Sequence, residues 1–377
     1  MSLFEIFAAL VTIAAAFSYV NHRFLKLPTT IGLMAMALVL SLLLLAAGGL
    51  SPSLVSDGRR ILGSIDFSRT LMQGMLGFLL FAGSLHVNLD DLRRQRGVVS
   101  VLATAGVLVS TLLVGGMAWA VLNPLLGLDV GWGYCLLFGA LVSPTDPIAV
   151  LGILKQLGAP KTLEAKIAGE SLFNDGVAVV VFLAIAGWLG FGHGGHGEVS
   201  ALSVLHLFTV EAGGGVAFGL LSGGVAFLLL RSVDNYQVEI LISLALVAGG
   251  YATCDRLGVS GPIAMVVAGL LIGNHGRTLA MSASTREHLD TFWELVDEIL
   301  NAVLFVLLGF EVLVLTFTRD LLLTGLLMIP VVVLARWLAV GGTLGVMRRW
   351  RAFSPHAVKI LTWGGLRGGI SVALALS

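Results

Sequence analysis

Twelve apolar stretches constrain this chain more than any other feature of its sequence. A helix that crosses a bilayer needs about 20 predominantly apolar residues. Stretches of about that length occur at residues 3–20, 30–47, 70–87, 98–122, 132–154, 166–190, 203–230, 237–253, 258–273, 299–316, 321–346 and 357–377. Charged residues make up only 12% of the chain, about half of the roughly 25% usual in soluble domains. We therefore expect an all-α polytopic membrane protein with about twelve transmembrane helices, forming one membrane domain over residues 1–377.

The distribution of basic residues predicts the orientation in the membrane. With the N-terminus outside, the inner loops hold fifteen lysines and arginines and the outer loops hold five. Basic residues favour the cytoplasmic side, so we expect this orientation in a cell (inner) membrane. The first stretch lacks the features of a cleaved signal peptide, and we interpret it as the first transmembrane helix. The net charge is zero, which gives no indication of a nucleic-acid partner.

Two prolines interrupt the fifth apolar stretch beside an acidic residue. Pro144 and Pro147 flank Thr145 and Asp146. Each proline removes a helical hydrogen bond, so the carbonyls of Ala140 and Ser143 should lose their helical partners. Irregular backbone within a membrane is tolerated where it lines a cavity or is buried in protein. We expect an oxygen-rich pocket for a hard monovalent cation here; a plain proline kink would not require the carboxylate.

The twelfth stretch contains a second interruption. Residues 364–369 read Gly-Gly-Leu-Arg-Gly-Gly inside an otherwise apolar run, and glycine weakens a helix. Interrupted segments in corresponding positions of two halves indicate a transporter built from inverted repeats. We predict that these two broken helices cross, with Arg367 near the negative helix ends and Asp146 facing the positive ones.

The sixth stretch carries polar side chains on one face. Ser171, Asn174 and Asp175 are spaced i, i+3, i+4, so all three should point the same way. Asp175 lies in the apolar run with no charged neighbour on that face. Such a carboxylate can hold a proton or a cation, but not both. It is the minimal site at which two ions compete while the site opens to each side in turn.

Two neighbours of Asp175 refine this prediction. Asn174 occupies a position where a second carboxylate would carry a second proton, so one-for-one electroneutral exchange is the simpler expectation. Glu170 lies about 100° around the helix from Ser171. We expect it to form a buried ion pair with an arginine inside the membrane, Arg336 first and Arg367 second.

Three further polar features remain open between structural and functional roles. The acidic segment Phe292–Glu298 precedes the tenth stretch and is interpreted first as a favourable charge at a helix start; a cytoplasmic patch that senses pH is the alternative. Asn301 is undecided between packing and the ion path. We expect His86, near the end of the third stretch, to be interfacial.

Four motifs carry a resemblance that extends over nearly the whole chain. The sequence resembles the monovalent cation/proton antiporters of the bacterial NhaP and animal NHE type at Pro144–Pro147, Gly169–Gly176, Phe292–Asn301 and Gly364–Gly368. The resemblance implies a homodimer, with a dimerisation part at residues 1–90 and 203–316 and a core ion-transport part at 98–190 and 321–377. It also implies a thirteenth helix beyond Ser377 in the full protein.

The resemblance further implies roles for individual residues. Asp175 matches the aspartate that binds both the ion and the proton, while Asp146, Ser171 and the Thr145 backbone carbonyl match the other ligands of Na⁺. Glu170 with Arg336 matches a structural ion pair, and Asn174 matches the electroneutral branch. Some relatives place a glutamate in the third helix near the ion, where this sequence has Phe81-Ala82-Gly83.

The expected function is therefore secondary antiport of a monovalent cation, Na⁺ before Li⁺ or K⁺, against H⁺, without enzymatic activity or a cofactor. Two rival classes remain. A cation channel would show a repeated filter segment or a symmetric ring of charges. An intramembrane aspartyl protease would use Asp146 and Asp175 as a dyad, but no Gly-x-Gly-Asp pattern surrounds Asp175.

Overall fold

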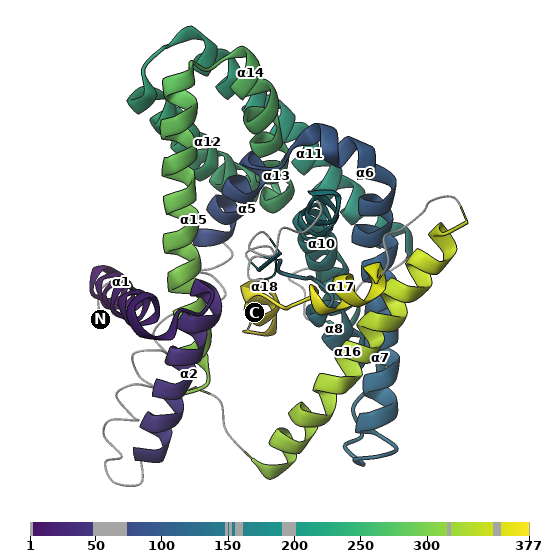
Figure 1. Ribbon diagram of the computed structural model, residues 1–377. Helices are drawn as coiled ribbons and strands as arrows, with labels where there is room; N and C mark the ends of the chain where they lie inside the picture. The colour runs from purple at the N-terminus through teal and green to yellow at the C-terminus, as the bar shows by residue number, and fades with distance from the viewer. Residues whose placement is uncertain are drawn as a thin grey trace.

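The computed structural model describes residues 3–47, 74–147, 150, 153–154, 161–190, 201–314, 318–349 and 356–376, and all its regular elements there are helices. Short π-helical turns join or extend several of them. Figure 1 labels the α-helices. The α-helices are α1 (Leu3–Val20), α2 (Thr29–Ala47), α5 (Leu76–Leu85), α6 (Leu89–Val101), α7 (Val107–Leu122), α8 (Trp132–Val142), α10 (Lys161–Trp188), α11 (Ala201–Ser232), α12 (Tyr236–Leu257), α13 (Gly261–Leu271), α14 (Arg277–Leu279), α15 (Ala283–Glu311), α16 (Arg319–Met347), α17 (Ala357–Trp363) and α18 (Gly369–Leu376).

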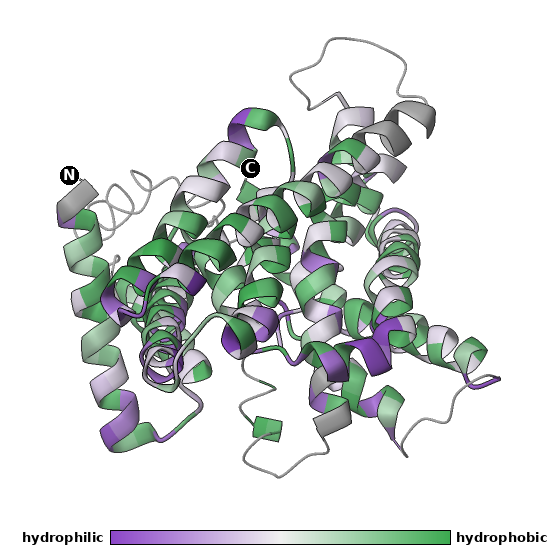
Figure 2. Ribbon diagram, turned by 90° about the horizontal axis from the view of Figure 1, so that it is seen from above, coloured by the Kyte–Doolittle hydropathy of each residue, from purple (hydrophilic) through white to green (hydrophobic). Residues whose placement is uncertain are grey.

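Seven helical segments in the described part of the chain are long and apolar enough to cross a membrane. They are 5–25, 29–46, 89–122, 166–188, 209–232, 236–257 and 319–347. Hydrophobic residues follow most of the length of the helices, as Figure 2 shows from above. Many large apolar side chains are exposed, for example Leu221 at 72% and Leu326 at 67%, which suits a surface in contact with lipid.

Two predicted helix starts were wrong because polar residues continue the helix outside the apolar stretch. The stretch predicted from residue 98 belongs to a helix that begins at Leu89, where the Asn88 side chain accepts hydrogen bonds from the first turn. The stretch predicted from residue 299 belongs to α15, which begins at Ala283 after the Ser282 cap. Hydropathy locates the apolar part of a helix, whereas capping residues locate its start.

Both predicted helix interruptions are present. Helix α8 ends at Val142, and residues 143–147 are not helical. Helix α17 ends at Trp363, and the chain stays non-helical until α18 begins at Gly369. The α17 and α18 ribbons lie near the centre of Figure 1, and α18 contacts α8, α10 and α15.

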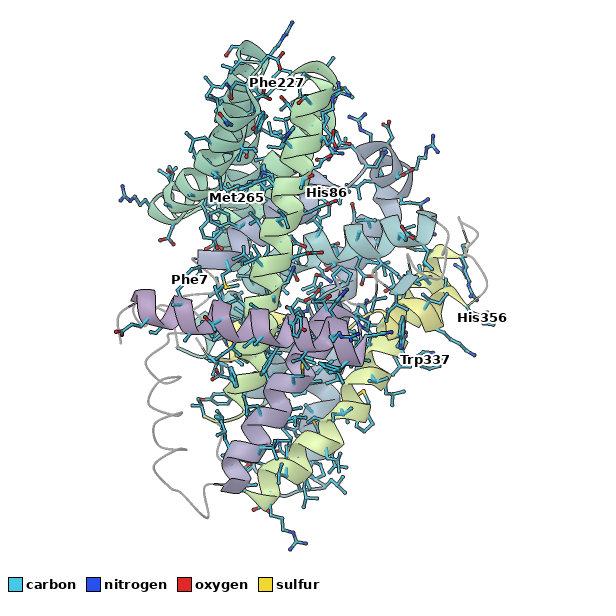
Figure 3. All side chains as sticks on the ribbon, turned by 60° about the vertical axis from the view of Figure 1, so that its left-hand side comes forward. Phe7, His86, Phe227, Met265, Trp337 and His356 are labelled. Carbon is cyan, nitrogen blue, oxygen red and sulfur yellow. The ribbon has the colours of Figure 1, made fainter. Side chains whose placement is uncertain are left out.

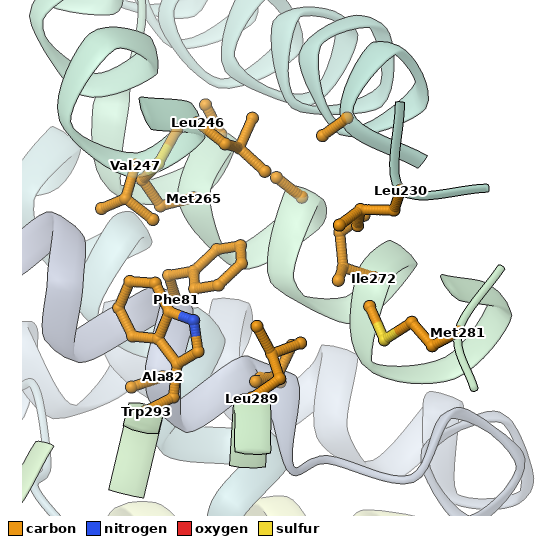
Figure 4. Close-up of a cluster of buried hydrophobic side chains, with 14 of the residues drawn as sticks. Phe81, Ala82, Leu230, Leu246, Val247, Met265, Ile272, Met281, Leu289 and Trp293 are labelled. Atoms are coloured by element: carbon orange, nitrogen blue, oxygen red, sulfur yellow. The ribbon is translucent and has the colours of Figure 1, made fainter. Parts of the chain in front are cut away.

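The buried apolar side chains form several clusters. The largest joins α5, α11, α12, α13 and α15 around Trp293 and Phe81 (Figure 4), whose ring centroids are 4.7 Å apart. A second cluster joins α1 and α2 to α15, and a third joins α6, α10, α16 and α17. The second interruption leads into α18, which contacts both α10 and α15.

Candidate functional site

The first interruption is fixed to α10 through Thr145. The Thr145 backbone carbonyl accepts a hydrogen bond from the Ser171 hydroxyl, and Asn174 Nδ2 donates to Thr145 Oγ1 at 2.7 Å. All three residues are buried, with exposed fractions of 4% or less. Ser171 and Asn174 therefore hold the unwound segment against the helix that carries Asp175.

The two interrupted segments contact each other directly. The Asp146 backbone N–H donates to the Leu366 carbonyl at 2.8 Å. The Asp146 carboxylate lies against Gly368, where an added Cβ would lie 2.6 Å from the Asp146 Cβ and 2.9 Å from its Cγ. A glycine at position 368 is thus required for this close approach.

Arg367 binds the backbone that the prolines leave open. Its Nη1 donates to the carbonyls of Ser143 at 3.1 Å and Pro144 at 3.0 Å. The Ala140 carbonyl accepts from the Ser143 N–H at 3.2 Å. Both carbonyls have lost their helical partners, as predicted, but neither is left open: a local turn satisfies one, and an arginine distant in sequence satisfies the other.

Glu170 forms a buried ion pair with Arg336, the first of its two predicted partners. Arg336 Nη2 lies 2.6 Å from Glu170 Oε1, and the residues are 5% and 2% exposed. Gly365 packs against this pair, since a Cβ there would lie 2.8 Å from Arg336 Nε. The pair joins α10 and α16 to the second interruption.

A cavity of about 560 Å³ opens beside the two interruptions. Asp146, Thr145, Ser171 and Asp175 all line it. Its acidic lining residues are Asp91, Asp146, Glu164, Asp175, Glu294 and Asp297. Among the lining residues in the described part of the chain, none is a lysine or arginine. A cavity lined by one sign of charge concentrates ions of the opposite sign, so this one favours cations.

Further polar residues line the cavity, and the sequence analysis had left them undecided between structural and functional roles. Glu294, Asp297 and Asn301 on α15 line it, as does His86 after α5. His86 Nε2 lies 3.7 Å from Glu294 Oε1, and Figure 3 shows His86 beside α15. The i, i+3, i+7 spacing of the three α15 residues, which places them on one helix face, was the available signal. His86, which is exposed at the end of α5, therefore also lines the cavity.

Replacing Gly368 with alanine should weaken Na⁺ affinity by about tenfold, ~1.4 kcal/mol. The added methyl group would contact the Asp146 side chain and displace it. Sodium-dependent proton flux in proteoliposomes gives the apparent affinity. Gly342→Ala is the matched control, since no atom lies within 4 Å of a Cβ there. Equal affinities in the two variants would show that the Asp146 position is unimportant.

Comparison with known proteins identifies the family. Residues 8–377 match the family described as "Sodium/hydrogen exchanger, transmembrane". The chain is 52% identical to the Na(+)/H(+) antiporter NhaP of Pseudomonas aeruginosa, over 99% of this chain and 88% of that protein. It is 34% identical to NhaH of Halobacillus dabanensis, over 94% and 84%.

The fold has a solved counterpart. The sodium proton antiporter MjNhaP1 of Methanocaldococcus jannaschii aligns with a TM-score of 0.74 and 21% identity, covering 100% of this chain and 88% of that chain. This likeness confirms the prediction of an all-helical, multi-pass membrane protein, and the family match confirms the resemblance found in the motifs. The chain belongs to the sodium/hydrogen exchanger family and is a transporter.

Proposed function

We propose that this protein exchanges Na⁺ for H⁺ across a membrane, with the two ions competing for Asp175. The observation that carries the proposal is the acidic cavity: Asp146 and Asp175 both line it, next to a helix interruption held by hydrogen bonds. Membership of the sodium/hydrogen exchanger family argues against the two rival functions, a cation channel and an aspartyl protease. The two carboxylates have further oxygen atoms around them, and such a set of oxygens is better suited to binding a hard monovalent cation than to acting as the catalytic dyad of a protease.

Each residue of the site has a distinct part in this proposal. Asp175 binds Na⁺ or the proton, and Asp146 and Ser171 contribute further oxygens. The Thr145 carbonyl, which accepts the Ser171 hydroxyl, retains a second lone pair for the ion. Asn174 positions Thr145 without adding a charge. Arg367 and the Glu170–Arg336 pair hold the two interruptions in place.

The exchange requires the cavity to open to each side in turn. We assign residues 1–90 and 203–316 to a dimerisation part and residues 98–190 and 321–377 to a core part that moves. The location of the cavity between helices of both groups supports this division. The core part would carry Asp175 past the static wall, as in transporters built from inverted repeats.

Three features of the assembly belong to the same proposal. The protein is a homodimer in the cell (inner) membrane, with its N-terminus outside. Residues 1–377 form twelve spans. The bias of fifteen inner to five outer basic residues supports the orientation, and the two interrupted segments support an inverted repeat.

Proton flux in proteoliposomes tests the proposed function. An imposed pH gradient is followed with a pH-sensitive dye, and Na⁺, Li⁺ and K⁺ are added in turn. Addition of Na⁺ should dissipate the gradient, and liposomes without protein are the control. A cation flux that leaves the proton gradient unchanged would contradict antiport.

The exchange should not respond to an imposed membrane potential. Asn174 leaves Asp175 as the group that trades one proton for one cation, so no net charge crosses in a cycle. Proteoliposomes with a potassium diffusion potential, set by valinomycin, should therefore give the same rate at about 0 and about −100 mV. One uncompensated charge would change the driving force by about 2.3 kcal/mol per 100 mV. A strong voltage dependence would overturn the one-for-one stoichiometry.

A further inference from the structure

One face of α15 lines the cavity and has no part in the exchange site described above. Glu294, Asp297 and Asn301 follow each other at i, i+3 and i+7, and all three line the same cavity as Asp146. Residues at this spacing lie on one side of a helix. In the proposed division this face belongs to the dimerisation part, whereas Asp175 belongs to the core part; both line the cavity.

Asn301 holds an oxygen atom for which the described residues supply no donor. The residue is 3% exposed. Its side chain hydrogen-bonds Asp297; because a carboxylate only accepts, the amide Nδ2 is the donor. The Asn301 Oδ1 is buried and has no hydrogen-bond partner among the described residues. A buried carbonyl oxygen without a donor is unfavourable unless another group, such as a cation, binds it.

A second unpartnered oxygen lines the cavity from α18. Ser371 is 7% exposed, and its Oγ has no hydrogen-bond partner in the described part of the chain. Helix α18 contacts α15, and Gly369 packs against Leu304, one turn beyond Asn301. The cavity therefore has a carboxylate and two unpartnered neutral oxygens, contributed by two adjacent helices, in addition to the exchange site.

We propose that Asp297 and Asn301 form a second cation station on α15, which receives the transported alkali cation before Asp175 binds it. The inference rests on the proposed function and adds a binding site to it. One carboxylate with neutral oxygens matches the ligands that hard monovalent cations prefer. A single carboxylate also favours weak binding, so that the cation can move on to the exchange site, where Asp146 and Asp175 supply two carboxylates. Asn301 is fixed for this role by its hydrogen bond to Asp297.

Substitution of either residue tests the station through the apparent KM for Na⁺. Asp297→Asn and Asn301→Leu should each raise this KM by about tenfold in proteoliposomes, the equivalent of ~1.4 kcal/mol, with little change in the maximal rate. Asp297→Glu, which keeps the carboxylate, should retain most of the affinity. A purely structural role would lower the maximal rate and the thermal stability and leave KM unchanged.

Glu298→Gln is the matched control. Glu298 neighbours Asp297 and carries the same charge, but it lines a different cavity, between α1 and α15. Its KM should equal that of the wild type. An equal rise in KM for Glu298→Gln would reveal a general field effect and overturn the station. An unchanged KM in both Asp297→Asn and Asn301→Leu would show that water satisfies these oxygens, which also overturns it. If Asn301→Leu does not fold, the KM of Asp297→Asn tests the proposal alone, because Asp297 is only half-buried and its replacement should be tolerated.

Sodium binding separates this inference from the proposed function. In Asp175→Asn, which removes the exchange carboxylate, ²³Na NMR relaxation should still detect weak Na⁺ binding. The double variant Asp175→Asn/Asp297→Asn should lose most of it. Equal Na⁺ binding by the single and the double variant would contradict the proposed second cation station, whether or not the wild type shows Na⁺-driven proton flux. Absence of Na⁺-driven proton flux in the wild type would instead contradict the proposed function.

Discussion

Replacement of Asp175 by asparagine should abolish Na⁺/H⁺ exchange and leave the fold intact. Asparagine has nearly the same shape as aspartate, but it can neither release a proton nor offer a charged oxygen to the cation. Asp175 lines the acidic cavity beside the fixed Thr145 segment. We expect a loss of at least about a hundredfold in Na⁺-driven proton flux, ~2.7 kcal/mol, with an unchanged elution profile and thermal transition.

Asp129→Asn provides the control for this substitution. Asp129 is exposed in the connection between α7 and α8. Its replacement by asparagine is the same substitution, made away from the cavity. Its exchange rate should equal that of the wild type. Normal turnover by Asp175→Asn would show that another group trades the proton for the cation, and the assignment of the site would fail.

Glu170→Ala should cause the largest loss of stability among single substitutions at the site. It would leave the Arg336 guanidinium buried, at 5% exposure, without its partner. Removal of one member of a buried ion pair destabilises a protein by about 3–5 kcal/mol. Thermal unfolding in detergent should show this loss, while the Na⁺ affinity of the remaining folded protein changes little. The reverse pattern would make Glu170 a ligand of the cation.

Two variants complete this test. Glu287→Ala removes the same side chain at an exposed position of α15 and should leave the unfolding temperature unchanged. The double variant Glu170→Leu/Arg336→Leu removes both charges, and it should recover part of the stability, because neither charge is then buried alone. A double variant less stable than Glu170→Ala would indicate that the pair holds α10 and α16 together through more than charge balance.

Local sequence patterns predicted the helices and their interruptions because these features depend on residues that are close together in the sequence. Apolar length predicts a span, and proline or glycine weakens a helix at its own position. The breaks at Pro144 and at Gly364–Gly368 followed from those rules. The Glu170–Arg336 pair was also accessible, because a buried charge requires a partner and few arginines lie within the apolar stretches.

The parts that sequence reasoning missed depend on contacts between distant segments. Arg367 was correctly expected near a negative helix end, but no local pattern indicates that it takes the Ser143 carbonyl, more than two hundred residues away. The acidic residues of Phe292–Glu298 were interpreted first as a favourable charge at a helix start, which was wrong because α15 already begins at Ala283. That Asp297 lines the cavity follows only from the placement of α15 beside it.

Calorimetric titration of Na⁺ into the purified protein tests competition at Asp175 most directly. The titration is repeated in buffers with different enthalpies of ionisation, which gives the number of protons released per cation bound. At a pH where Asp175 is protonated, we predict close to one proton released per Na⁺, and a large loss of this release in Asp175→Asn. Sodium binding to the wild type without proton release at any pH would contradict the account.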